Sequence, residues 1–150
     1  MCILCNWDDK SPEEKKEIIS MDVLDCSRCL LLAEIPSELV NLTHLSCSNC
    51  PMLSEIPPGL VNLKSLNCSR CLLLVEIPPE LVNLIHLSCH NCPLLVGIPP
   101  ELVNLRELHC PSCPLISSIP SELVNLTHFS CSGCPPVSYT HLRAHETDSY

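Results

Sequence analysis

The sequence is poor in aromatic residues, in glycine and in positive charge. Its 150 residues include one Trp, two Tyr and one Phe, three Gly, and eight Lys or Arg against seventeen Asp or Glu, for a net charge of -9. A core with so few rings has to be aliphatic, and three glycines cannot form a glycine-rich phosphate loop. Nucleic acids and anionic membranes require basic stripes, so this charge balance excludes them as main partners.

Long hydrophobic runs are also missing. No apolar run reaches the length of a membrane span, and residues 1–7 lack the charged start and long apolar segment of a secretory signal. Provided that Met1 is the natural start, we expect a cytoplasmic protein. In that reducing compartment, the fourteen cysteines would be free thiols or metal ligands and not disulfides.

What the sequence does have is a period of 21 residues. A Leu-Val-Asn triplet returns at this step and ends at Asn41, Asn62, Asn83, Asn104 and Asn125. Six Cys-x-x-Cys pairs keep the same step, with first cysteines at positions 26, 47, 68, 89, 110 and 131. With Leu42 as position 1, the consensus of the units reads L-x-x-L-x-C-x-x-C-P-x-L-x-x-I-P-x-E-L-V-N.

Over residues 21–136 this unit resembles the leucine-rich-repeat family, whose pattern is L-x-x-L-x-L-x-x-N/C-x-L. It is most similar to the short bacterial and giant-virus repeats with Cys at position 6. The resemblance implies an α/β repeat solenoid of about six coils, shaped as a horseshoe. Parallel strands would line its concave face, and short helical or 3-10 turns its convex side.

The direction of each side chain follows from the strand. Positions 4 and 6 of a short strand point to one side, and positions 3 and 5 point to the other. Leu45 and Cys47 are therefore predicted to face the core, and His44 and Ser46 the solvent. Because one coil cannot bury its apolar side alone, successive coils must stack.

The cysteine pairs admit two interpretations. Cys-x-x-Cys pairs separated by seventeen residues match the spacing of zinc sites, and two stacked coils would supply four thiolates. The repeat, however, already accounts for all six pairs, and a buried thiol packs as a small hydrophobe. We interpret the pairs as core residues and expect no metal or other cofactor; a cysteine-rich zinc-binding protein is the alternative.

Residues 1–20 are predicted to be a tail followed by a capping helix. Ser11 is suited to an N-cap, Pro12 to the first helical position and Glu14 to a capping box, so the helix should run from Pro12 to about Ser20. It would cover the exposed first layer of the core. Cys2 and Cys5 fall outside the repeat register, and we interpret them as part of a flexible tail and not as a ligand pair.

Residues 137–150 depart from the repeat. From Val137 the string VSYTHLRAHET resembles the translation of a transposase-type sequencing adapter. We interpret this segment as an artefact joined to a truncated reading frame, so that it lies outside the fold. His141 and His145 accordingly receive no functional role.

Variation among the coils is concentrated at positions 2, 3, 5 and 8, which we call the strand face; positions 6, 9, 16 and 21 do not vary. A uniform scaffold with one variable face indicates an interaction surface, and neutral drift at solvent positions is the alternative. The face should be near neutral or mildly basic, and the return segments acidic. The candidate partner-binding residues are His44, Ser46, Lys64, Asn67, Arg70, His86, Ser88, Arg106, His109 and His128.

The sequence offers no catalytic constellation. No nucleophile, base and orienting acid recur together, so we expect no enzyme activity and no small-molecule substrate. The predicted function is a non-catalytic scaffold that binds a protein partner. Two alternatives are the substrate-recognition module of a longer enzyme, such as a bacterial effector, and a metal or pH-sensitive site formed by the strand-face histidines.

Overall fold

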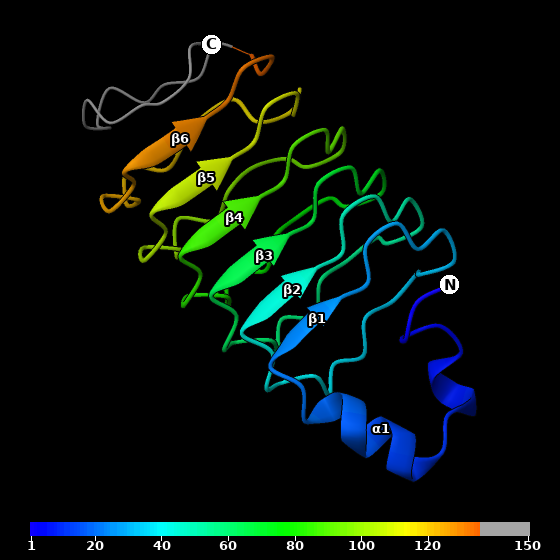
Figure 1. Cartoon of the computed structure of the whole chain (residues 1–150). Helices are drawn as coiled ribbons and strands as arrows, with labels where there is room; N and C mark the ends of the chain where they lie inside the picture. The colour runs from blue at the N-terminus through cyan, green and yellow to red at the C-terminus, as the bar shows by residue number, and fades with distance from the viewer. Residues whose placement is uncertain (136–150) are drawn as a thin grey trace.

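The computed structural model of the chain describes residues 1–135, which form a solenoid with one parallel sheet (Figure 1). In this part the sheet has six strands in sequential order: β1 (Val23–Asp25), β2 (His44–Ser46), β3 (Ser65–Asn67), β4 (His86–Ser88), β5 (Glu107–His109) and β6 (His128–Ser130). Each strand residue pairs with the residue one 21-residue period further on, as Leu45 does with Leu66. The predicted artefact, residues 137–150, lies outside the described residues.

The core is a set of columns, each filled by one position of the repeat. In the second coil Leu45 is 2% exposed and Cys47 is fully buried, whereas His44 is exposed, so the predicted alternation is confirmed. Burying one leucine fully contributes roughly 1.5–3 kcal/mol, and each coil buries several. The side chains of one coil that enter the core are Leu42, Leu45, Cys47, Cys50, Leu53, Ile56 and Leu60.

The position-9 thiols also bond the coils together. Cys71 Sγ donates to the carbonyl of Cys47 at 3.2 Å, so that each such bond joins a coil to the one before it. Contact with the Cys71 thiol, and burial, raise the pKa of Cys47, which keeps it a neutral thiol. The same bond is made, at 3.0–3.3 Å, by Cys50, Cys92, Cys113 and Cys134.

On the convex side of residues 21–135 the coils turn without forming helices. We expected short helical or 3-10 turns there, but the chain makes separate turns, such as those closed by Leu81 N–H to the Pro78 carbonyl at 3.2 Å and by Leu84 N–H to the Leu81 carbonyl at 3.1 Å. The two turns do not join into a helix, because Val82 N–H donates to the Glu80 carbonyl at 2.8 Å and not to a carbonyl three or four residues earlier.

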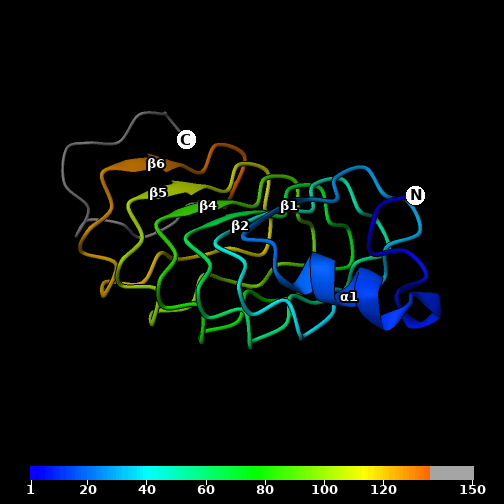
Figure 2. The ribbon, with the colours of Figure 1, turned by 60° about the horizontal axis from the view of Figure 1, so that its bottom comes forward.

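The N-terminal helix is present as predicted. Helix α1 (Pro12–Ile19) follows a 3-10 turn, η1 (Trp7–Asp9), and lies at the β1 end of the solenoid (Figures 1 and 2). Both bonds of the capping box form: Ser11 N–H donates to Glu14 Oε2 at 2.8 Å, and Glu14 N–H to Ser11 Oγ at 3.2 Å. Ile18, on the inner side of α1, is 4% exposed and belongs to the core cluster.

Residues 1–10 pack against the first coil, in place of the flexible tail that we expected. Leu4 is 3% exposed and belongs to the same core cluster, and Cys2, Cys5 and Trp7 pack against it. The physical reason is the open end of the solenoid, where an apolar side chain such as Leu4 gains burial that no preceding coil provides. Among residues 1–135, no helix is long and apolar enough to cross a membrane.

Candidate functional site

The strand register arranges the variable side chains in columns. Residues aligned in one column belong to neighbouring coils and are about 4.8 Å apart. The position-3 column holds Val23, His44, Ser65, His86, Glu107 and His128, and the position-5 column Asp25, Ser46, Asn67, Ser88, His109 and Ser130. The position-2 column beside them holds Asp22, Thr43, Lys64, Ile85, Arg106 and Thr127.

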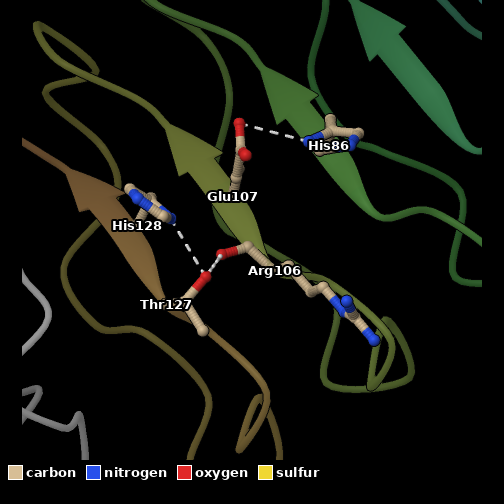
Figure 3. A network of polar contacts seen from close by, with 5 residues as sticks. All are labelled: His86, Arg106, Glu107, Thr127 and His128. Carbon is tan, nitrogen blue, oxygen red and sulfur yellow. Dashed lines mark hydrogen bonds and ion pairs between the residues drawn. The ribbon is translucent and has the colours of Figure 1, made fainter.

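Within the position-3 column, His86 is paired with Glu107. His86 Nδ1 lies 3.2 Å from Glu107 Oε2 on the adjacent strand (Figure 3), and both side chains are close to half exposed. A pair this exposed contributes at most about 1 kcal/mol to stability, so its main effect is to orient the imidazole. Glu107 was absent from the candidate residues, although one 21-residue step from His86 would have located it.

Two further histidines of this column are oriented by the threonine that precedes each. Thr127 Oγ1 donates its only hydrogen to the Arg106 carbonyl at 3.2 Å, so His128 Nδ1–H must donate to Thr127 Oγ1, at 3.0 Å (Figure 3). In the neutral tautomer with this hydrogen bond, Nε2 is the acceptor nitrogen. Thr43 and His44 repeat the arrangement at 3.0 Å and 2.9 Å.

These three histidines do not form a metal site. His44, His86 and His128 are separated along the column by Ser65 and Glu107, so neighbouring histidines are two strand spacings, about 9.6 Å, apart. A zinc ion binds imidazole nitrogen at about 2.0–2.1 Å. The column therefore presents three separate acceptor groups and not one chelating group.

Three of the predicted partner-binding residues are occupied by contacts within the solenoid. Ser46 Oγ lies 2.7 Å from Ser27 Oγ of the preceding coil, and Ser88 Oγ 3.0 Å from Ser69 Oγ. Asn67 Oδ1 accepts the backbone N–H of Ser69 at 3.2 Å. All three are half-buried, so the position-5 column supports the loops as much as it faces solvent.

At the exit of the strands, position 8 has a left-handed backbone in every coil. Arg70 is exposed and has a φ of 58°, and Arg28, Asn49, Asn91, Ser112 and Gly133 have φ values of 54–77°.

His90, at the preceding position 7, is a half-buried histidine. Burial, with the nearby charges of Arg70 and His109, lowers its pKa, so that this ring is neutral. His90 was not predicted as a site residue; the signal for it was a His at position 7, where four other coils have Ser.

Two of the four cations of the strand face line one shallow depression. Lys64 and Arg106 lie two coils apart in the position-2 column with half-buried Ile85 between them, and with the adjoining asparagines they line a depression of about 350 Å³. The whole face carries four Lys or Arg and three Asp or Glu, in agreement with the predicted near-neutral balance. Here alone, among the described residues of this face, two cations flank an apolar floor.

The invariant asparagine at position 21 has a structural role that the sequence did not reveal. Asn83 Nδ2 donates to the carbonyl of Val61 in the preceding coil at 2.8 Å, across an exposed edge. The same bond, at 2.8–3.0 Å, is made by Asn41, Asn62, Asn104 and Asn125. These side chains therefore form hydrogen bonds that hold neighbouring coils in register.

A second exposed surface is apolar and was not predicted. The aliphatic side chains at position 11 are 41–69% exposed, although large apolar side chains normally favour the core. We call them the position-11 column: Leu31, Met52, Leu73, Leu94 and Leu115. An apolar residue at this position in all five coils was the signal for it.

Comparison with known proteins identifies the repeat. A family model described as Leucine Rich Repeat matches four consecutive segments, residues 41–63, 62–84, 83–105 and 104–126. Together these segments cover more than half of the chain. No curated protein matches the chain.

Solved structures share the fold. A leucine-rich-repeat protein of Leptospira interrogans is 26% identical with a TM-score of 0.65, over 83% of this chain and 34% of its own. The plant peptide hormone receptor RGFR1, in complex with RGF2, is 21% identical with a TM-score of 0.63, over 83% of this chain and 23% of its own. The ectodomain of the Arabidopsis thaliana receptor kinase GASSHO1/SCHENGEN3, in complex with CASPARIAN STRIP INTEGRITY FACTOR 2, is 29% identical with a TM-score of 0.54, over 75% and 15%.

Proposed function

Since the chain belongs to the leucine-rich-repeat family, we propose that it is a non-catalytic module that binds a protein or peptide partner through its strand face. The observation that carries this proposal is the contrast between a scaffold repeated from coil to coil and a face whose exposed side chains differ. Backbone groups of neighbouring strands bond to one another, so a partner on this face has to be recognised by side chains.

The most distinctive feature available to a partner is the depression between Lys64 and Arg106. Two flexible cations about 9.6 Å apart, with Ile85 between them, suit a segment that carries carboxylates and a small apolar side chain. His86, His128 and His44 lie in the adjacent column, already oriented by Glu107 or by a threonine. Preorganised side chains lose less entropy on binding, which favours them as contact residues.

Two of the similar solved structures are complexes with a ligand, which supports a protein or peptide partner in general terms. The chain spans 34%, 23% and 15% of the length of the three structures compared. The partners of those proteins therefore cannot be assigned to this chain. A role as the substrate-recognition module of a longer enzyme is retained as the second candidate. We propose a cytoplasmic location, because no disulfide joins cysteines within residues 1–135, which is typical of a reducing compartment.

The proposal is tested with two matched sets of substitutions and a partner recovered by pull-down on the full chain. The strand-face set replaces Lys64, His86, Arg106 and His109 by Ser, and the control set replaces Glu38, Glu80, Glu101 and Glu122 of the return segments by Gln. All eight sites are exposed or half-buried, so each change should alter the free energy of unfolding by about 0.5 kcal/mol or less. We expect the first set to weaken binding and the second to leave it nearly unchanged.

The opposite result would place the interaction elsewhere. If the glutamate set abolishes binding and the strand-face set does not, the functional surface is on the return segments. A third set, Leu73→Ser with Leu94→Ser, examines the position-11 column, where both leucines are more than 40% exposed. Loss of binding in this set alone would assign the partner to the apolar column.

A further inference from the structure

Three thiols from two distant parts of the sequence converge at the N-terminal end of the solenoid. Cys2 Sγ lies 3.8 Å from Cys5 Sγ, and Cys5 Sγ lies 3.2 Å from Cys29 Sγ. All three sulfur atoms are within 4.8 Å of one another. In residues 1–135 no other group of three or more Cys, His, Asp or Glu side chains brings its ligand atoms together in this way.

The repeat does not account for this cluster. In later coils the position-9 thiol donates to the carbonyl of the position-6 cysteine one coil earlier, as Cys50 does to Cys26 at 3.3 Å. Cys29 is the position-9 thiol of the first coil and has no earlier coil to bond; its sulfur meets Cys5 instead. Cys2 and Cys5 lie outside the 21-residue register, so core packing of the repeat does not require thiols at these positions.

We propose that Cys2, Cys5 and Cys29 bind one soft metal cation, with Zn²⁺ as the expected ion, and so fasten the N-terminal segment to the first coil. Thiolates select soft or borderline ions such as Zn²⁺. Each of the three thiols releases one proton to solvent as its sulfur binds the ion, and no electron is transferred. The proposal does not depend on what the strand face binds.

The sulfur positions suit a tetrahedral ion. With Zn–S bonds of about 2.3 Å, two sulfurs of a tetrahedron are about 3.8 Å apart, which is the separation of Cys2 and Cys5. Cys29 and Cys5, at 3.2 Å, have to move apart by about 0.6 Å to reach this separation, and the tail that carries Cys5 contains no strand that resists the shift. The backbone N–H of Cys2 donates to Cys5 Sγ at 3.4 Å, an outer-shell hydrogen bond of the kind that orients a metal-binding side chain.

A fourth ligand has access from outside. Cys2 and Cys5 line a depression of about 270 Å³ together with Asp9, Lys10 and Glu14. Glu14 already accepts the Ser11 N–H at 2.8 Å, and no carboxylate of residues 1–135 lies within 4.8 Å of all three sulfurs, so a water molecule is expected to complete the tetrahedron. Lys10 offsets the net negative charge of an ion held by three thiolates.

Such a site would fix the N-terminal segment, residues 1–10, on the open end of the solenoid. Leu4, between Cys2 and Cys5 in the sequence, is 3% exposed and contributes to the core of the first coil. Terminal coils of a solenoid need a cap, and a bound structural metal adds its binding free energy to folding. The metal would therefore stabilise the fold without taking part in partner binding.

The test uses the full chain, reduced with a phosphine, exposed to Zn²⁺ and freed of excess metal. We expect one zinc per chain by elemental analysis, with X-ray absorption reporting three sulfur ligands at about 2.3 Å. The double variant C2S/C5S should lose this zinc, and chelation should lower the melting temperature of the wild type but not of the variant. The matched control is C134S, because Cys134 is the other half-buried thiol and lies in the last coil described; it should keep its zinc.

Three results would overturn the proposal: a wild type with far less than one zinc per chain, equal zinc in the wild type and in C2S/C5S, or a Cys5–Cys29 disulfide that forms in the presence of Zn²⁺ without reductant. Should C2S/C5S fail to fold, the single variant C2S replaces it, with Co²⁺ as the probe. Its thiolate-to-cobalt charge-transfer absorption should fall by about one third when one of three sulfurs is lost. An unchanged spectrum would exclude Cys2 as a ligand and contradict the site.

Discussion

Cys71 donates its thiol hydrogen to the backbone carbonyl of Cys47, across the boundary between two coils, at 3.2 Å. Both residues are fully buried, so that this carbonyl has no access to water. The position-9 cysteine thus packs in the core and also donates a hydrogen bond to the preceding coil. In the family pattern this position is Asn or Cys, and Asn can donate a hydrogen bond as well.

Replacing Cys71 by Ala should destabilise the protein, because the Cys47 carbonyl loses its thiol donor in a buried site. The expected decrease in the free energy of unfolding is about 1–3 kcal/mol, measured by chemical denaturation under reducing conditions. Cys71→Ser keeps a donor at the same position and should lose less. An alanine variant as stable as the wild type would show that the thiol contributes by volume alone.

The asparagine bonds between coils give a second prediction. Asn83→Asp keeps the size of the side chain but removes the N–H that donates to the Val61 carbonyl at 2.8 Å. Because the edge is exposed, we expect a loss of about 0.5–1.5 kcal/mol in thermal or chemical denaturation. Asn49→Asp is a suitable control, since no bond across the edge is made by that side chain; comparable losses in both variants would point to charge and not to the lost donor.

Backbone conformation at position 8 predicts an order of substitutions. Asn91 has a φ of 54°, a left-handed conformation that β-branched residues tolerate poorly. Asn91→Val should lower the melting temperature, with a cost of about 1–2 kcal/mol, whereas Asn91→Gly should be close to neutral. Equal stability of the two variants would mean that the turn relaxes to a different conformation.

The capping box makes the N-terminal helix sensitive to acid. Hydrogen bonds from the Ser11 backbone and side chain hold the pKa of Glu14 below its usual value. A carboxylate with a lowered pKa contributes its stabilisation above the ordinary pKa, near 4.5, and loses it as the pH falls through the lowered value. Nuclear magnetic resonance titration should report a depressed Glu14 pKa, and E14Q should remove this part of the acid sensitivity of α1.

Most of the fold could be predicted from the sequence, because the same pattern of buried and exposed positions recurs in every 21-residue unit. One strand alternation in a single unit placed Leu45 inside and His44 outside, and the same pattern recurs in the other coils. The bonds from Cys71 and Asn83 were not predictable in the same way. They join residues of adjacent coils whose separation depends on how closely the coils stack.

The candidate site was predicted less completely, for a physical reason. Exposure of His86 and Lys64 follows from position in the repeat, but the contacts that occupy Ser46, Asn67 and Ser88 depend on side-chain rotamers and on the loops that follow the strands. The packing of Cys2 and Cys5 on the first coil was missed because neither residue belongs to the 21-residue period, and the period was what assigned core residues in the coils.

The central claim, that a partner occupies the strand face, is tested most directly by hydroxyl-radical footprinting of the full chain with and without the partner. Histidine, leucine and methionine side chains all react when exposed, so one experiment compares both surfaces. We expect protection of His44, His86 and His128 on the strand face, and unchanged reactivity of Met52, Leu73 and Leu94 in the position-11 column. Protection of the position-11 column with no change at the three histidines would contradict the claim.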